Sequence, residues 1–178
     1  MNEIPTPNPM QPTSEAFSHG SGLEVVFTEP VREQSPEMLV AMIRQVVPLS
    51  GIPQFFDRAY TEITGALHRV HMSPSGPALA VSYGLPEETI DLGAAFPIAT
   101  GMSADGDVNV VTIPACEVAT LTVHGPYDQI SAGYDRLLAY MNEIAMQPGP
   151  ISWEEYLTMP EPGGDPALNV TKLRWMLV

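Results

Sequence analysis

Cysteine is nearly absent from this sequence, which has one such residue, Cys116, among its 178. A single cysteine excludes a disulfide within the chain and cannot form a thiolate zinc site by itself. Cys116 stands in an apolar stretch without a neighbouring histidine or asparagine, so we interpret it as a small buried thiol rather than a nucleophile. The sequence therefore predicts neither a metal centre nor a cofactor.

Basic residues are also scarce. Seven lysines and arginines stand against 21 aspartates and glutamates, which gives a formal net charge of −14. Such a charge repels phosphate backbones and anionic lipid surfaces, and it speeds the approach of cations. We therefore expect no direct binding to nucleic acid or to a membrane, and we interpret most of the acidic residues as keeping the protein in solution.

Long hydrophobic runs are missing as well. The longest apolar runs are far shorter than a membrane span, and Met1 to Pro5 lack the basic residues and apolar centre of a secretion signal. We expect a cytoplasmic protein. Hydrophobic residues make up 44% of the sequence, which suits one compact domain or two small units with a shared core.

The first 22 residues combine prolines with polar residues, and Phe17 is the one aromatic side chain there. This composition predicts a flexible tail. The predicted domain covers residues 23–178.

Within that domain the same order of elements occurs twice. Repeat one, residues 23–99, predicts strands over 23–28, 38–47, 78–83 and 89–98, with an amphipathic helix after Ser50. Residues 100–107 form a polar linker. Repeat two, residues 108–178, predicts strands over 108–113, 117–123, 151–158 and 169–178, with a helix over 130–145. The composition of segment 38–47 is compatible with a helix or a strand. Its counterpart in repeat two, 117–123, is predicted as a strand, so we predict a strand here as well.

The repeats can be compared by counting. An offset of 74 pairs Tyr60 with Tyr134, and an offset of 73 pairs Gly76-Pro77 with Gly149-Pro150 and Tyr83 with Tyr156. We therefore predict an α+β fold, a pseudo-twofold tandem of two strand-strand-helix-strand-strand repeats. They would form one antiparallel sheet with the helices on one face. A central cleft is expected on the opposite, concave face.

The predicted strand at residues 151–158 carries two adjacent acids, Glu154 and Glu155, among aromatic rings. Alternation places them on opposite faces, and a buried unpaired carboxylate costs on the order of several kcal/mol. A tyrosine hydroxyl prefers a polar partner, so we place Tyr156 toward the cleft and Glu154 with it. Trp153 and Leu157 would then pack on the helices. Solvation of both glutamates on an exposed face is the alternative.

Several segments with characteristic spacing occur together in this chain. They are His124-Gly125-Pro126-Tyr127, Tyr134-Asp135-Arg136-Leu137-Leu138-Ala139-Tyr140, Gly149-Pro150, Trp153-Glu154-Glu155-Tyr156-Leu157-Thr158-Met159-Pro160 and Leu173-Arg174-Trp175. Together they resemble the GyrI-like small-molecule-binding domain, a module that also serves as the effector-binding domain of AraC-type and MerR-type multidrug-responsive regulators. The resemblance covers roughly residues 23–178. Met159 and the position of His124 depart from the family pattern.

The resemblance implies a hydrophobic, aromatic-lined pocket with a glutamate, which maps onto Glu154. The implied ligand is a hydrophobic, aromatic or cationic small molecule, and the chain would act as a stand-alone sensor or sequestering protein with a regulatory protein partner. The candidate ligand-binding residues are Glu154, Tyr156, Tyr127, Trp175, Tyr83 and Trp153.

Two alternatives stay open. Some stand-alone relatives resemble cyclopropanoid cyclopropyl hydrolases, which implies Glu154 and Tyr156 as catalytic residues that activate water. A single carboxylate is a weak catalytic signature, however. The acidic surface also permits inhibition of a basic protein partner.

Overall fold

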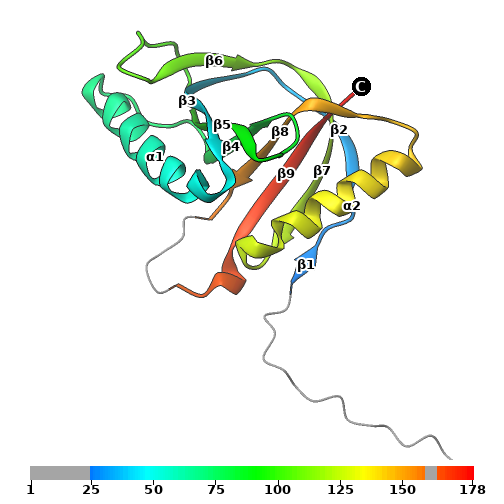
Figure 1. Cartoon of the computed structure of the whole chain (residues 1–178). Helices are drawn as coiled ribbons and strands as arrows, with labels where there is room; N and C mark the ends of the chain where they lie inside the picture. Colours follow the sequence, from blue (N-terminus) through cyan, green and yellow to red (C-terminus); the bar gives the residue numbers. More distant parts are fainter. Residues whose placement is uncertain (1–24, 159–163) are drawn as a thin grey trace, which may run out of the picture.

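The computed structural model describes residues 25–158 and 164–178 (Figure 1). The predicted tail, residues 1–22, lies outside these residues, and so do Met159 and Pro160. The described part of the chain forms one nine-stranded sheet with two α-helices packed on it, which confirms the predicted α+β class.

Most predicted elements are confirmed. The elements are β1 (Val26–Phe27), β2 (Val31–Ser35), β3 (Met38–Pro48), α1 (Ile52–Arg69), β4 (Ala78–Tyr83), β5 (Thr89–Pro97), β6 (Asn109–Ile113), β7 (Cys116–His124), α2 (Ile130–Glu143), β8 (Pro148–Tyr156) and β9 (Val170–Leu177). Segment 38–47 is a strand, as its counterpart indicated. The predicted strand over 23–28 is wrong as the first strand of repeat one, because β1 covers two residues and β2 takes that role.

The strand order makes the sheet curl. The order is β1-β7-β9-β8-β4-β5-β3-β6, and β2 pairs with β7. Only Pro36 and Glu37 join β2, at one end of the sheet, to β3 at the other. Pro114 and Ala115 join β6 to β7 in the same way. The first strand of each repeat therefore pairs with the second strand of the other repeat, and the two ends of the sheet are drawn together.

Three clusters of buried side chains fill the fold. One lies between α1 and repeat one, and a second lies between α2 and repeat two. The third lies on the face without helices and contains Trp153, Val40 and Val118, each 0% exposed. The prediction that this face holds an open cleft is wrong, because the curled sheet closes around its own side chains. The prediction that Trp153 packs on the helices is wrong for the same reason.

The element boundaries show that the offset between the repeats changes within the helices. Ser35 and Ile113 end β2 and β6, and Ile52 and Ile130 begin the helices, at an offset of 78 in both pairs. Arg69 and Glu143 end the helices at an offset of 74, so α1 is four residues longer than α2.

The sheet ladders then extend this comparison to β4 and β8. Met42 lies opposite Ala95, which lies opposite Leu79. Met42's counterpart Thr120 lies opposite Arg174, which lies opposite Trp153. Leu79 therefore corresponds to Trp153, at an offset of 74. The offset of 73 predicted for these strands is wrong, since it would exchange the two faces of the sheet.

A glycine allows α2 to lie close to the sheet. A Cβ at Gly133 would stand 2.6 Å from Leu173 Cδ1 and 3.0 Å from Val123 Cγ2. Contacts of this length are repulsive, so a larger residue would push the helix outward. Gly133 therefore fixes the distance between α2 and β9.

Candidate functional site

The two helices cover the outer strands of the sheet and not its middle. Helix α1 packs on β3 and β5, and α2 packs on β7 and β9 (Figure 1). An α-helix is about 10 Å wide, whereas eight strands span about 34 Å. Two helices therefore leave the central strands, β4 and β8, between them.

Glu154 lies on this central part of the sheet. It stands in β8 opposite Ala80 of β4 and Leu173 of β9. Leu173 belongs to the cluster under α2, so Glu154 points to the face that carries the helices. At the offset of 74, Ala80 is also the counterpart of Glu154 in repeat one. The pseudo-twofold axis therefore passes through this pair, with a methyl group on one side and a carboxylate on the other.

Three tyrosines from three elements surround the carboxyl group. Tyr156 of β8 donates a hydrogen bond of 2.6 Å from its hydroxyl to Glu154 Oε2. Tyr134 of α2 is a second hydrogen-bonding neighbour of Glu154. Burial raises the pKa of Tyr60 of α1, and the nearby charge of Glu154 raises it further. The Tyr60 hydroxyl donates a hydrogen bond of 2.8 Å to the Leu79 carbonyl.

The surroundings of Glu154 change its ionisation. Burial raises the pKa of this carboxyl above its usual value, and the hydrogen bonds from Tyr156 and Tyr134 oppose that rise. The residue as a whole is nevertheless intermediate in exposure and not fully buried. Burial also raises the pKa of Tyr156 and Tyr134, and both stay protonated donors at neutral pH.

Aromatic rings extend the site on both sides. Tyr127 meets the Tyr156 ring edge-on at 5.5 Å between centroids, and Trp175 meets the Tyr134 ring at 5.6 Å. On the side of repeat one, Tyr60 stacks on Phe56 at 5.6 Å. We call Glu154 together with Tyr60, Tyr127, Tyr134, Tyr156 and Trp175 the tyrosine site.

The neighbouring acid, Glu155, has a different environment. It lies on the opposite face, where Arg174 Nε stands 2.6 Å from Glu155 Oε1 and Trp153 donates to the same oxygen at 3.2 Å. Arg174 also pairs with Glu33 of β2. Within residues 25–158 and 164–178, Glu154 takes part in no ion pair. In the described part of the chain, Arg174 thus neutralises Glu155, whereas Glu154 has no basic partner.

The structure brings together four of the predicted site residues and separates two. Glu154, Tyr156, Tyr127 and Trp175 lie on the helix-bearing face. Trp153 and Tyr83 lie on the other face, where the Tyr83 hydroxyl contacts Met42 Sδ at 3.4 Å and Arg44 covers the ring at 3.5 Å.

Tyr60 and Tyr134 were not among the predicted site residues. Both stand on the apolar faces of the predicted helices, where they resemble core residues. The signal that could have found them is their pairing at the offset of 74, because a tyrosine kept in both repeats at one helix position points to the space that the helices share.

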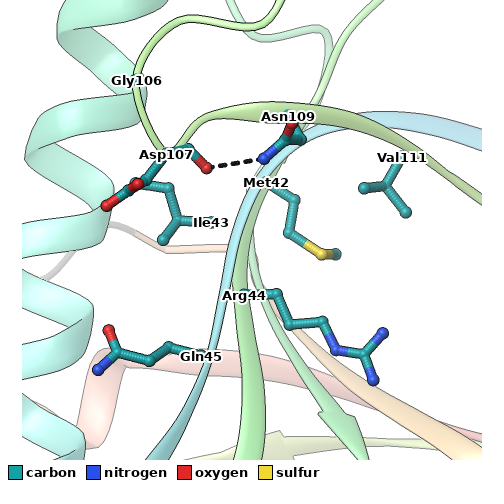
Figure 2. Close-up of a pocket in the computed structure, with 8 residues that line it drawn as sticks. All are labelled: Met42, Ile43, Arg44, Gln45, Gly106, Asp107, Asn109 and Val111. Carbon is teal, nitrogen blue, oxygen red and sulfur yellow. Dashed lines mark hydrogen bonds between the residues drawn. The ribbon is translucent and has the colours of Figure 1, made fainter.

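Two hollows lie elsewhere, along β3. The larger, about 430 Å³, is lined by Met42, Ile43, Arg44, Gln45, Gly106, Asp107, Asn109 and Val111 (Figure 2). The smaller, about 290 Å³, lies between β3 and α1. Neither is lined by Glu154. Among the described residues, no helix has the length and apolar character needed to cross a membrane.

Comparisons with known proteins match this fold. Residues 28–177 match the GyrI-like small molecule binding domain. No curated protein sequence matches the chain.

Three solved structures illustrate the likeness. The EcmrR–DNA complex has a TM-score of 0.70 at 18% identity, and the match covers 85% of this chain but 57% of EcmrR. SAV2435 bound to tetraphenylphosphonium has a TM-score of 0.62 at 12% identity, covering 85% of this chain and 94% of SAV2435. A hydrolase from Listeria innocua has a TM-score of 0.62 at 13% identity, covering 84% and 92% of the two chains. At sequence identities of 12% to 18%, these similarities show a shared fold and nothing further.

Proposed function

We propose that this chain, which belongs to the GyrI-like small molecule binding domain family, binds lipophilic cations with aromatic groups at the tyrosine site. The family confirms the resemblance drawn from the sequence and establishes small-molecule binding as its general role. The proposal adds the charge of the ligand and the residues that hold it.

The observation that carries the proposal is the carboxylate of Glu154, which forms no ion pair with any residue that the structure describes. A half-buried carboxylate costs free energy unless a cation or hydrogen bonds compensate for it. Here two tyrosine hydroxyls supply hydrogen bonds, but no cation of the described residues neutralises the charge. A ligand cation would complete the site in the way that Arg174 completes the site of Glu155.

The tyrosine site offers such a cation two kinds of attraction. At about 5 Å and an effective dielectric constant of about 20, a carboxylate attracts a unit positive charge with about 3 kcal/mol. Each aromatic face adds about 0.5 to 2 kcal/mol of cation–π attraction. Tyr127, which is 36% exposed, and Tyr156 would provide the rings nearest to solvent.

One structural relative supports the choice of ligand. SAV2435, which shares the fold over 94% of its length, is bound to tetraphenylphosphonium, a cation with four phenyl rings. The net charge of −14 favours the approach of any cation to this chain.

Calorimetric titration with tetraphenylphosphonium tests the proposal. Glu154→Gln keeps the shape of the side chain and removes its charge, and we expect it to weaken binding at least about tenfold. Glu143→Gln at the end of α2 serves as the matched control, because it removes the same charge about 13 Å along the helix from Tyr134. Triphenylphosphine oxide, which is neutral, should bind both forms alike. Equal tetraphenylphosphonium affinity of Glu154→Gln and the control would refute the assignment.

Hydrolysis is the second candidate, and the raised pKa of Glu154 favours it. A carboxylate with a raised pKa is a stronger base, and the Tyr156 hydroxyl at 2.6 Å holds it in place. Glu154 would take a proton from water while the water oxygen bonds to a cyclopropane carbon. The ring C–C bond would break, and its electrons would move to a conjugated carbonyl that is then protonated. Loss of the ultraviolet absorbance of a spirocyclopropyl dienone, compared between wild type and Glu154→Ala, tests this function. Identical rates in the two proteins would contradict it.

A further inference from the structure

The aromatic rings of the tyrosine site follow the internal repeat. Phe96 and Trp175 are counterparts, because the residues that lie opposite them in β3 and β7 are separated by the offset of 78. Phe96 meets the Tyr60 ring edge-on at 5.5 Å between centroids, and Trp175 meets the Tyr134 ring edge-on at 5.6 Å. Each repeat therefore supplies a helix tyrosine and a strand ring in the same arrangement, one pair on each side of the pseudo-twofold axis.

The charge of the site does not follow the repeat. Glu154 lies opposite its counterpart Ala80, so a carboxylate stands on one side of the axis and a methyl group on the other. The two helix tyrosines differ in the same way. The Tyr134 hydroxyl forms a hydrogen bond with Glu154, whereas the Tyr60 hydroxyl donates to the backbone carbonyl of Leu79 at 2.8 Å.

The strands of repeat one bring no charge to this face of the sheet. The side chains of β4 and of the adjoining part of β5 alternate between the helix-bearing face and the buried cluster on the other face. Those on the helix-bearing face are Ala78, Ala80, Ser82, Leu92, Ala94 and Phe96. None of these side chains is ionisable.

Helix α1 adds a further aromatic ring to this side. Phe56 stacks on Tyr60 with 16° between the ring planes and so covers one face of the Tyr60 ring. The repeat-one side of the site therefore offers aromatic and aliphatic surface, and the repeat-two side offers aromatic surface together with a carboxylate.

We propose that the tyrosine site selects monocations over dications of the same size, and that Ala80 determines this selectivity. The inference rests on the proposed function and adds the number of charges that the ligand carries. The charge of a monocation lies at Glu154, and its uncharged rings lie against Tyr60 and Phe96.

A dication would place its second charge on the side of repeat one. Adjacent strands are about 4.8 Å apart, so the far end of a two-ring ligand that starts at Glu154 of β8 lies over β4 or β5. There the second charge would lose part of its water and meet the Ala80 methyl group instead of a carboxylate. A charge that loses water without gaining a partner opposes binding. The Tyr60 ring compensates little, because Phe56 covers one of its faces.

Two ligands of nearly equal shape test the proposal on the wild-type protein. N-methyl-4-phenylpyridinium and N,N′-dimethyl-4,4′-bipyridinium both consist of two joined rings, and they carry one and two positive charges. Their affinities are measured by displacement of tetraphenylphosphonium at physiological ionic strength, where screening over about 8 Å limits the general attraction of the acidic chain for dications. We expect the monocation to bind at least about tenfold more tightly. A dication that binds as tightly or more tightly overturns the proposal.

Variants of Ala80 test its role. Ala80→Glu supplies the missing carboxylate, and we expect it to raise the affinity for the dication at least about tenfold and to reverse the preference. Ala80→Gln adds nearly the same bulk without charge and should not produce this gain. Asn142→Asp, at an exposed position of α2, adds the same net charge away from the site and should leave the ratio of the two affinities unchanged. A similar gain in all three variants would contradict the role of Ala80.

The folding of these variants needs a check of its own, because Ala80 is 5% exposed. Thermal unfolding provides it, and Ala80→Asp, with a shorter side chain, replaces Ala80→Glu if the latter does not fold. The comparison of the two ligands on the wild-type protein depends on neither variant.

The selectivity and the proposed function fail in different ways. Glu154→Gln should weaken the binding of both ligands if the proposed function holds. If it does so and the wild type does not prefer the monocation, the function stands and the selectivity is refuted. If Glu154→Gln changes neither affinity, the proposed function is refuted and the selectivity with it.

Discussion

Removal of one hydroxyl group should reveal how Glu154 is held in its charged form. Tyr156→Phe deletes the donor that stands 2.6 Å from Glu154 Oε2 and keeps the ring that contacts Tyr127. A hydrogen bond to a charged group contributes about 1.5 to 3 kcal/mol, and one between neutral groups about 0.5 to 1.5 kcal/mol. The variant should therefore lose about 1 kcal/mol more stability when Glu154 is ionised than when it is protonated.

The sign of the pH dependence follows from the raised pKa of Glu154. Its folded pKa lies above the unfolded value of 4.5. The group therefore favours the folded state most at pH values below 4.5, and this contribution is lost as pH rises through the folded pKa. Tyr156→Phe removes a hydrogen bond that lowers this pKa, so the loss should be larger in the variant.

Urea unfolding at about pH 4.5 and about pH 8 measures both effects. The double variant with Glu154→Gln completes a thermodynamic cycle, in which we expect a coupling of about 1 to 2 kcal/mol at the higher pH. Equal destabilisation by Tyr156→Phe at both pH values, together with a coupling near zero, would refute the described role of the hydroxyl group.

Three further predictions concern the charge, the two faces and the packing of the site. Glu154→Gln should raise the free energy of unfolding at about pH 8, where it removes the cost of a buried charge. Below about pH 4.5 the carboxyl group is protonated, and the substitution should have no such effect. Urea titrations at both pH values measure the difference. Trp153→Leu should cost about 2 to 4 kcal/mol in urea unfolding and leave the affinity for tetraphenylphosphonium unchanged, because this ring lies on the face opposite Glu154. Gly133→Ala should lower the free energy of unfolding by about 1 to 3 kcal/mol, because the added Cβ would contact Leu173. Gly65→Ala in α1 should raise it, because a Cβ there would stand 3.4 Å from its nearest neighbour, the end of the Arg69 side chain. Thermal unfolding should therefore show a lower midpoint for the first variant and a higher midpoint for the second.

The comparison of corresponding segments in the two repeats of the sequence predicted much of the fold. Segment 38–47 follows Pro36 and has helix-forming residues, yet its counterpart identified it as β3. Strand β2 was missed because Val31–Ser35 alternates weakly, with one buried residue in five. Its pairing with β7 depends on a long-range contact that local sequence does not encode.

The preference of Tyr156 for a polar partner favoured Glu154 over Glu155, and the family resemblance selected it. The hydrogen bond between Tyr156 and Glu154 agrees with the first of these arguments. The face was assigned wrongly, because the prediction assumed that helices cover the whole of the face on which they lie. The sheet is wider than two helices, and only the three-dimensional strand order shows that β4 and β8 are the strands left between them. Arg174, which neutralises Glu155, likewise becomes its neighbour only through the pairing of β8 with β9.

The central claim is that an ionised Glu154 holds the charge of a cationic ligand, and the pH dependence of affinity tests it most directly. Titration with tetraphenylphosphonium between about pH 4.5 and pH 9 should show wild-type affinity rising up to tenfold per pH unit below the raised pKa of Glu154 and levelling off above it. Affinity of Glu154→Gln should stay flat over the same range. Parallel pH profiles for the two proteins would contradict the claim.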